Sequence, residues 1–326
     1  MINRRSVLTG ALAAAAMPLV RRAALAEGYP ERLIRMIVPA SAGGQTDVLA
    51  RFLAQQIQGP LGQAIVIDDR PGAGGATAAR AAAAADADGY TLFFGNTSVL
   101  AVIPAVSRSP GYDPIKNFAP VASVSESYTI LVVHPDFPAR TTAEFIAYAK
   151  AHPGKLNFGN AGAGNVTHLT GEMFKAAAGL DFVSVPHKGG MESVTSLLGK
   201  QGVDFVFESP VILLPLIAER RLRALGVTSA ARKAELADVP TMREGGADMV
   251  ATLLTGVVAP AGTPPAIVAK LNGLINDGLK TDAMRATLAK FGSEPRISSP
   301  ADFSAFMIAE SRKWGSVAKA AGVVVD

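Results

Sequence analysis

Two glycine-rich segments carry the residue types best suited to binding a ligand, and each joins a predicted strand to a predicted helix. Residues 39–47 read Pro-Ala-Ser-Ala-Gly-Gly-Gln-Thr-Asp, and residues 160–169 read Asn-Ala-Gly-Ala-Gly-Asn-Val-Thr-His-Leu. Glycine lets the backbone approach a ligand closely, and a helix start presents unpaired N–H groups with a partial positive charge. Both segments can therefore bind an anion without lysine or arginine. Four polar side chains add possible donors: Ser41, Thr46, Asn165 and Thr167.

A purely structural role for the two segments stays open. Glycine-rich turns are common between strands and helices because they turn tightly, and Thr46 or Thr167 is a suitable helix N-cap. The spacing of Gly162, Gly164 and Thr167 is similar to a dinucleotide-binding fingerprint that lacks its third glycine. No acidic residue follows about 20 residues later at the end of a clear second strand. The sequence therefore supports nucleotide binding only weakly.

Catalytic chemistry has few candidate residues. The chain has no cysteine, which excludes thiolate nucleophiles, iron–sulfur clusters and disulfides, and it has neither a Gly-x-Ser-x-Gly elbow nor a P-loop. Of the four histidines, His134 and His152 precede prolines in predicted loops. His168 precedes Glu172 by four residues, a spacing that can bind a metal, although a histidine hydrogen-bonded to the backbone is the more common case. We therefore expect no metal and no cofactor.

The elements that position these residues alternate between short β-branched runs and helical patterns. This alternation predicts parallel sheets that are covered by helices on both faces. The predicted strands span residues 32–38, 64–67, 91–94, 129–133, 156–159, 182–185, 203–207 and 222–227. Predicted helices span 47–57 and 76–85, and others begin at Thr141, at Thr263-Pro264 and at Ser299-Pro300.

These elements predict two α/β domains, one inserted into the other. Residues 27–125 and 246–326 form the first domain, and residues 126–245 form the second. The two crossovers, near residues 125 and 245, form a hinge around a central cleft.

The first 26 residues resemble an export signal. Arg4 and Arg5 precede an apolar run of about 14 residues, too short for a bilayer that needs roughly 20, and Ala24-Leu25-Ala26 is a small-residue cleavage site. The two arginines suit a twin-arginine signal, and an ordinary secretory leader remains the alternative. We expect cleavage after Ala26 and a soluble protein outside the cytoplasm.

Most of the basic charge belongs to this leader. Its four arginines reduce the 31 basic residues to 27 when they are removed, which equals the 27 acidic residues. A nucleic-acid-binding protein needs surplus positive charge on one face after processing. The sequence therefore predicts no nucleic-acid partner.

The ordered motifs of the chain resemble the periplasmic solute-binding proteins of tripartite tricarboxylate transporters, the Bug family. The resemblance extends from Tyr29-Pro30 to Ala320-Ala321-Gly322. It rests on Ile37-Val38-Pro39 with Ala42-Gly43-Gly44 and Thr46-Asp47, on Arg70-Pro71-Gly72-Ala73-Gly74-Gly75, on Asp88-Gly89-Tyr90-Thr91-Leu92, on Pro153-Gly154-Lys155-Leu156, on Val185-Pro186-His187-Lys188-Gly189, on Asp238-Val239-Pro240-Thr241, and on Ala259-Pro260-Ala261-Gly262-Thr263-Pro264. The ordered combination of these motifs is specific, whereas each motif alone is ordinary.

The resemblance implies a two-domain, periplasmic-binding-protein-like (type II) α/β fold that closes on a small organic carboxylate. It further implies a periplasmic, cofactor-free binding protein rather than an enzyme, which delivers its ligand to the membrane permease subunits of a tripartite transporter. We expect a monomer. In this family the two glycine-rich loops bind the carboxylate through backbone amides, hydroxyls and water. The predicted ligand-binding residues are Ala40, Ser41, Ala42, Gly43, Gly44, Gln45, Thr46, Asp47, Gly162, Ala163, Gly164, Asn165, Val166, Thr167, His168, His187, Lys188, Gly189 and Glu208.

The chain departs from the family pattern within the predicted site. Ala40-Ser41 replaces a usual aromatic-Pro pair, Asn165-Val166 replaces a Ser-Thr pair, and Leu254-Thr255 replaces Trp-Phe. Gln45 replaces a usual glycine, and His187 replaces a usual tyrosine. The lost rings at positions 40 and 254 suggest room for a bulkier carboxylate, aromatic or branched, with Gln45 and His187 as new polar contacts.

Three alternatives stay open at this point. Glu208 is a candidate partner for a ligand ammonium, and equally a solvated rim residue or a partner for Lys188. An exported α/β enzyme that acts on a carboxylate would use His168 or His187 as acid or base. A periplasmic sensor that presents its closed form to a signalling partner would need the same domain closure as a transport protein.

Overall fold

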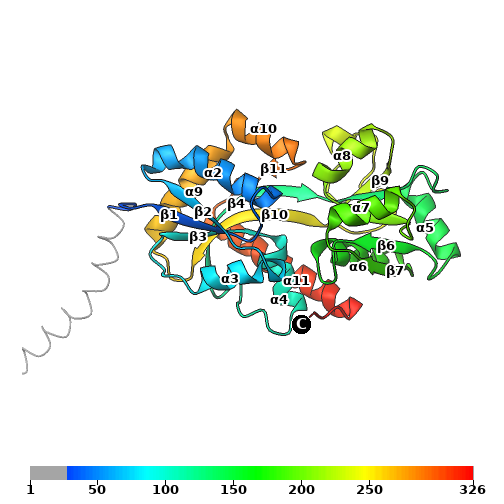
Figure 1. Ribbon diagram of the computed structural model, residues 1–326, viewed down its shortest axis with the longest axis horizontal. Coiled ribbons are helices and arrows are strands. Elements are labelled where there is room, and N and C mark those ends of the chain that lie inside the picture. Colours follow the sequence, from blue (N-terminus) through cyan, green and yellow to red (C-terminus); the bar gives the residue numbers. More distant parts are fainter. Residues whose placement is uncertain (1–27, 326) are drawn as a thin grey trace, which may run out of the picture.

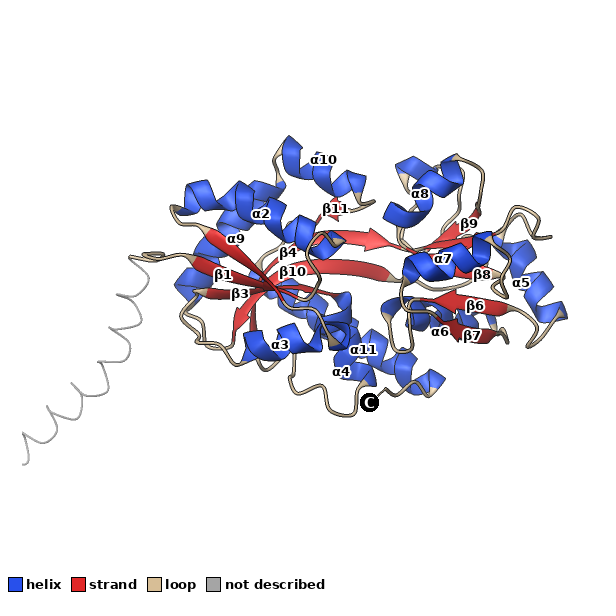
Figure 2. Ribbon diagram, in the orientation of Figure 1, coloured by secondary structure: helices blue, strands red, loops and turns tan. Residues whose placement is uncertain are grey.

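The structure is a computed structural model that describes residues 28–325, so the predicted leader and its cleavage site after Ala26 lie outside the described residues. Two α/β lobes lie side by side, each built around its own sheet (Figure 1). Figure 2 shows two long antiparallel strands of the first sheet that extend toward the second lobe. This architecture is the predicted two-domain arrangement.

The first lobe contains a six-stranded mixed sheet. Its strand order is β11 (Glu294–Pro295), β4 (Phe118–Tyr128), β10 (Thr252–Pro260), β3 (Thr91–Asn96), β1 (Ile34–Val38) and β2 (Ile65–Asp69). β1 pairs in parallel with β2 and β3, as predicted, but β10 is antiparallel to both β3 and β4. The prediction of a purely parallel sheet was wrong because β10 returns from the second lobe and enters the sheet from the opposite end.

Helices cover both faces of this sheet. They are α2 (Gln45–Leu61), α3 (Ala76–Ala83), α4 (Ile103–Val106), α9 (Pro265–Leu279), α10 (Asp282–Lys290) and α11 (Pro300–Ala321), with short turns η1 (Ala73–Gly75) and η2 (Ser98–Val102). The apolar sides of α2 and α9 pack on one face of the sheet, whereas α3, η2 and the start of α11 pack on the other. α9 starts at Pro265 with Pro264 as its N-cap, one residue later than predicted. α11 has the predicted start, a capping box between Ser299 and Asp302.

The second lobe contains a five-stranded mixed sheet. Its order is β7 (Val183–Pro186), β6 (Asn157–Asn160), β8 (Phe205–Glu208), β5 (Ile130–Val133) and β9 (Arg223–Val227). Its helices are α5 (Thr142–Ala151), α6 (Val166–Ala178), α7 (Gly190–Leu198) and α8 (Pro210–Ala218). β6 is parallel to β7 and β8, so the loops that lead into α6, α7 and α8 leave the same edge of the sheet.

The crossovers between the lobes meet at one buried point. Thr129 separates β4 from β5, and its N–H donates to the Thr228 hydroxyl at 2.9 Å. The N–H of Thr228 donates back to the Thr129 carbonyl, and Ala251, which precedes β10, donates to the Thr228 carbonyl. All three residues are fully buried. The two chain passages therefore lie against each other.

α11 connects the lobes a third time. Its first half packs Phe303 and Met307 into the core of the first lobe, whereas Trp314 and Ala318 pack into the core of the second. In Figure 1 the helix passes beneath the junction of the lobes. Residues 300–321 therefore contribute to both cores, although the predicted division places them with the first domain alone.

Close packing of α6 on β6 positions the loop between them. A Cβ added to Gly171 would lie 2.1 Å from Cε1 of Phe158, which is fully buried in the aromatic core of the second lobe. We predict that Gly171→Ala lowers the free energy of unfolding by about 1–3 kcal/mol because the ring must move. Urea unfolding measures this change.

Gly273→Ala is the matched control. Gly273 lies on the exposed side of α9, and a Cβ there would have no atom within 4 Å. This substitution is expected to raise stability by about 0.5–1 kcal/mol through helix propensity alone. Equal effects of the two substitutions would contradict the packing argument.

Candidate ligand-binding cleft

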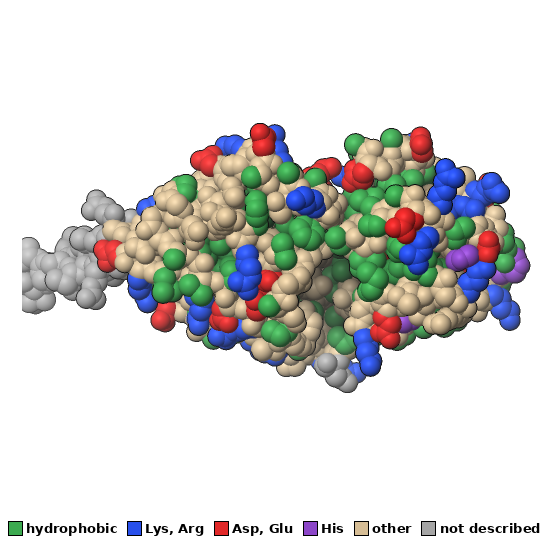
Figure 3. All heavy atoms as spheres, turned by 45° about the horizontal axis from the view of Figure 1, so that its top comes forward, with side chains coloured by type: hydrophobic (Ala, Val, Ile, Leu, Met, Phe, Trp, Pro, Cys, Tyr) green, Lys and Arg blue, Asp and Glu red, His purple; other side chains and the backbone are tan. Residues whose placement is uncertain are grey.

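Two adjoining cavities occupy the junction of the lobes, where the molecular surface is hollowed (Figure 3). We call the smaller one, of about 140 Å³, the inner pocket. Its lining residues are Gln45, Thr46, Asn96, Thr97, Ser98, Ser125, Ser127, Val166, Leu253, Leu254, Thr255 and Ser293. None of these described lining residues carries a charge, so any anion there must be held by neutral donors.

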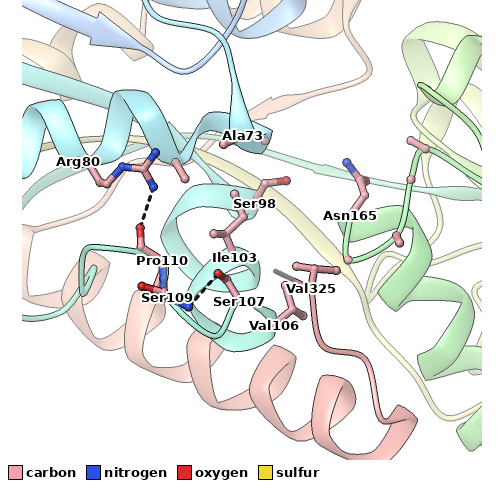
Figure 4. A pocket seen from close by; sticks show the side chains of 16 residues that line it. Ala73, Arg80, Ser98, Ile103, Val106, Ser107, Ser109, Pro110, Asn165 and Val325 are labelled. Carbon is pink, nitrogen blue, oxygen red and sulfur yellow. Dashed lines mark hydrogen bonds between the residues drawn. The ribbon is translucent and has the colours of Figure 1, made fainter.

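We call the larger cavity, of about 460 Å³, the outer chamber (Figure 4). Its lining residues are Ala73, Gly74, Ala76, Arg80, Ser98, Ile103, Val106, Ser107, Ser109, Pro110, Ala161, Gly162, Ala163, Gly164, Asn165 and Val325. Ser98 lines both cavities, so they adjoin at this residue, and we refer to the two together as the cleft.

The loop between β1 and α2 reaches the inner pocket through its last residues. Gln45 and Thr46, at the start of α2, line this pocket. The earlier predicted residues lie elsewhere: Ala40 packs against the core of the first lobe, and residues 41–43 are exposed outside both cavities. Of the nine-residue segment, the structure thus brings two side chains to the cleft.

Asp47 stabilises the conformation of this loop through a buried hydrogen bond. Its carboxylate is 2% exposed and accepts a hydrogen bond from the Gly43 N–H at 2.7 Å. Arg51, one turn later, places its guanidinium 2.6 Å from both Asp47 and Asp69. Burial and the neighbouring Asp47 charge raise the pKa of Asp69, and Arg51 opposes that rise. Asp47 therefore acts on the loop and does not line either cavity.

The first amides of α2 remain open toward the inner pocket. Within the described chain, the backbone N–H groups of Gln45 and Thr46 have no hydrogen-bond acceptor, whereas Gly44 donates to Ser41 and Val48 donates to Gly44. Open amides at the start of a helix carry partial positive charge and bind anions. Thr46 adds a hydroxyl for which the described residues supply no partner.

The loop between β6 and α6 satisfies most of its own amides. The N–H of Ala161 donates to the Thr167 hydroxyl at 3.0 Å, and the N–H of Thr167 donates to Oδ1 of Asn165 at 3.0 Å. The N–H of Gly164 donates to Nδ1 of His168 at 3.1 Å. Thr167 and His168 therefore fix the loop from its buried side. Residues 162–165 line the outer chamber, and Val166, the first residue of α6, lines the inner pocket.

Gly164 shows why this loop needs glycine. Its φ is +71°, and an added Cβ would lie 2.9 Å from Val325 and 3.3 Å from Val106. A side chain would meet both valines and would favour a different backbone conformation. The loop of the second lobe thus approaches α4 and the C-terminal segment closely.

His168 is held in its neutral form. Its Nδ1 accepts the Gly164 hydrogen bond, and its Nε2 lies 3.8 Å from Glu172. Burial lowers the pKa of His168 and raises the pKa of Glu172. The backbone-bonded histidine considered from the sequence is therefore the arrangement found. Residues 28–325 contain no cluster of three or more potential metal ligands.

Residues 187–189 connect β7 to α7 and lie outside the two cavities. Both ring nitrogens of His187 have partners, the Val185 carbonyl at 3.0 Å and the Ser196 hydroxyl at 3.1 Å. Lys188 is exposed, and Gly189 is the N-cap of α7. None of the three lines the inner pocket or the outer chamber.

Glu208 is buried rather than placed on a solvated rim. It is 6% exposed at the end of β8, and its Oε1 accepts the Ser209 N–H at 2.9 Å. Its Oε2 has no hydrogen-bond partner among the described residues and lies against Gly190, where a Cβ would be 2.1 Å away. Burial raises the pKa of this carboxyl group. It forms no ion pair with Lys188 and lines neither cavity.

Sequence reasoning missed the hydroxyl groups of the inner pocket. Ser125 and Ser127 come from β4, Thr255 comes from β10, and Ser98 follows β3. The spacing of Ser125 and Ser127 was the available signal, because alternate residues of a strand share one face, whereas Ser123 lies beyond a register shift in the pairing and does not line the pocket. Leu254 lines the inner pocket, so position 254 influences its width, whereas Ala40 does not reach it.

Comparisons with known proteins agree with this two-lobed architecture. The family model described as the tripartite tricarboxylate transporter family receptor matches residues 49–323. The protein BugT of Bordetella pertussis is 36% identical over 299 residues, which cover 91% of each chain. Among solved structures, Rpa4515 of R. palustris with adipate is 34% identical with a TM-score of 0.79, over 91% of this chain and 99% of that one. MatC of Rhodopseudomonas palustris with bound malate is 31% identical with a TM-score of 0.76, over 89% and 99%.

The fold and its cleft are those of a solute-binding protein of the two-domain, type II kind. The chain belongs to the tripartite tricarboxylate transporter receptor family, TctC, which includes the Bug proteins. The resemblance seen in the sequence is thereby confirmed. No helix within residues 28–325 is both long and apolar enough to span a bilayer.

The buried Glu208 gives the folding stability of the protein a testable pH dependence. Its folded-state pKa lies above the unfolded-state value, so the folded protein favours the protonated carboxyl. That contribution is complete below the unfolded pKa of about 4.3 and is lost as pH rises through the folded pKa. We predict that Glu208→Gln, which cannot ionise, gains stability relative to the wild type as pH rises from 4 to 8. Urea unfolding across this pH range measures the difference.

Glu219→Gln provides the control, because Glu219 is exposed just after α8. Its unfolding free energy is expected to follow that of the wild type across the same pH range. The burial argument fails if the Glu208 variant also stays parallel to the wild type.

Proposed function

We propose that this protein binds a small organic carboxylate in the cleft and delivers it to the membrane permease subunits of a tripartite transporter. The protein would be exported to the periplasm and would act as a monomer. The leader-like residues 1–26 support export, and the solved relatives include proteins described as periplasmic. Relatives with bound adipate and malate support a carboxylate ligand.

One observation carries the proposal: the starts of two helices from different lobes line the same uncharged pocket. Gln45 and Thr46 open α2, and Val166 opens α6. Their helix dipoles both place partial positive charge at this pocket. A carboxylate bound between them would contact both lobes and would favour the closed arrangement. Hydroxyls of Ser98 and Thr46 would complete its hydrogen bonds.

An enzymatic function has less support from the same geometry. His168 and His187 are the histidines considered as acid or base, and their ring nitrogens are engaged within their own lobe. Neither histidine lines the cleft cavities. A binding protein leaves its ligand chemically unchanged, so recovery of intact ligand separates the two functions.

We predict that malate and adipate raise the thermal midpoint of the leader-free protein in a saturable way and are recovered unchanged. A ligand that binds only the folded state must stabilise it. Isothermal titration calorimetry gives the stoichiometry, and mass spectrometry of the ligand detects turnover. Conversion of the ligand would establish an enzyme instead, and the absence of any shift with mono-, di- and tricarboxylates would remove the carboxylate proposal.

Thr46→Ala tests the position of the carboxylate. Loss of this hydroxyl is expected to weaken ligand binding by about 0.5–1.5 kcal/mol, measured by calorimetry, because one donor to the anion disappears. Thr195→Ala is the matched control, since Thr195 lies on the exposed surface of α7 away from both cavities. Unchanged affinity in the Thr46 variant would place the carboxylate outside the inner pocket.

A further inference from the structure

The cleft contains one charged side chain, and it stands in the wall of the outer chamber. Arg80 of α3 is the only charged residue among the described residues that line either cavity. In Figure 4 its guanidinium lies on the side of the chamber opposite to Asn165. A lone cation in an otherwise neutral cleft determines which charge the chamber favours.

The Arg80 side chain is held in place by three contacts. Its Nη1 donates to the Pro110 carbonyl at 3.1 Å, and its Nη2 lies 3.4 Å from the Thr77 hydroxyl. Its alkyl chain lies against Gly111, where an added Cβ would come within 2.7 Å of Cδ. The guanidinium is therefore positioned before any ligand arrives, which lowers the entropy lost on binding.

The charge of Arg80 is not neutralised by the described part of the chain. Arg35, Arg51 and Arg70 of the same lobe each pair with an aspartate. Arg80 has only the two neutral acceptors named above, and a guanidinium carries five N–H donors. The remaining donors are available to a carboxylate, for which the planar guanidinium is well matched.

The chamber between Arg80 and the inner pocket is largely apolar. Ile103, Val106 and Val325 form part of its wall, and Ser98 lies where the chamber adjoins the inner pocket. A ligand that extends from the starts of α2 and α6 toward Arg80 would therefore cross an apolar region and end at a cation. This sequence of environments suits a molecule with two anionic ends and a hydrocarbon middle.

We propose that Arg80 is a specificity-determining residue that binds the second carboxylate of a dicarboxylate whose ends are separated by an apolar spacer. The inference rests on the proposed function, since the first carboxylate occupies the inner pocket. A monocarboxylate of the same length uses the inner pocket alone and gains nothing from Arg80. Because Arg80 is exposed to solvent, its contribution weakens as salt is added.

The test compares matched ligands on the leader-free protein by isothermal titration calorimetry. Adipate and suberate are the dicarboxylates, and hexanoate and octanoate are their monocarboxylate counterparts. In the wild type the dicarboxylates are expected to bind about ten-fold more tightly than the monocarboxylates, and added sodium chloride reduces this ratio. Arg80→Gln is expected to abolish the ratio and its salt dependence while leaving hexanoate affinity unchanged, and Arg80→Lys is expected to retain part of the ratio.

Arg32→Gln is the control for the loss of one exposed arginine, because Arg32 pairs with Asp88 and lines neither cavity. A dicarboxylate preference that survives in Arg80→Gln, or a wild type that binds both ligand classes equally, overturns the role of Arg80 while carboxylate binding stands. A wild type that binds none of the carboxylates removes the proposed function itself, and the inference with it.

Discussion

Backbone amides in the two cleft loops must find acceptors, and the way this chain satisfies them determines the site. Asp47 accepts from the first loop, while Asn165, Thr167 and His168 accept from the second. An unpaired buried amide costs about as much as a lost hydrogen bond, so these internal bonds hold each loop in one shape. The first amides of α2, at Gln45 and Thr46, have no acceptor among the described residues and adjoin the inner pocket. A ligand in that pocket would therefore be bound by a helix start that the side chains of the loop leave open.

The inner pocket is lined by neutral residues. The one charged residue among the described residues of the cleft, Arg80, lines the outer chamber instead. The hydroxyls of Thr46 and Ser98 are free to adjust to an anion, whereas Ser125 and Thr255 already bond each other at 2.7 Å. A neutral pocket discriminates by geometry more than by charge. Arg80, exposed and fixed, adds discrimination by charge at the other end of the cleft.

The connections between the lobes restrict how the cleft can open. Thr129 and Thr228 hold the two strand crossovers together, and α11 places Trp314 in the second core after starting on the first. On the opposite side, Lys233 pairs with Glu294 at 3.0 Å across the lobes. A hinge motion that opened the cleft would bend the crossovers at Thr129 and near Ala251, and α11, which packs into both cores, would restrict it.

Much of the fold could be predicted from local pattern. The predicted strands at 91–94, 156–159 and 222–227 agree with β3, β6 and β9 within one or two residues at most of their ends, and the cap at Ser299 is correct. β4 and β10 were not predicted, because serines at 123, 125 and 127 interrupt the apolar pattern that marks a buried strand. Ser125 and Ser127 line the inner pocket at the junction of the lobes, so their environment is a property of the assembled lobes rather than of the segment.

The candidate site was likewise predicted only in part from local pattern. Gln45, Thr46 and Val166 were selected because a glycine-rich turn precedes a helix, and the structure places all three at the inner pocket. The same reasoning selected Thr167, whereas His187 came from the family resemblance and Glu208 from its place after a predicted strand. None of these three residues lines either cavity.

By itself, the sequence indicated that two glycine-rich turns precede helix starts and that the chain resembles the tripartite tricarboxylate transporter receptor family, since both follow from local motifs. Tertiary structure alone decided which polar side chains hold the loops and which line the cavities. It also decided that Arg80, an ordinary arginine on an alanine-rich helix, lines the outer chamber with no acidic partner within residues 28–325. Such facts depend on which distant segments pack together, and no local pattern encodes that.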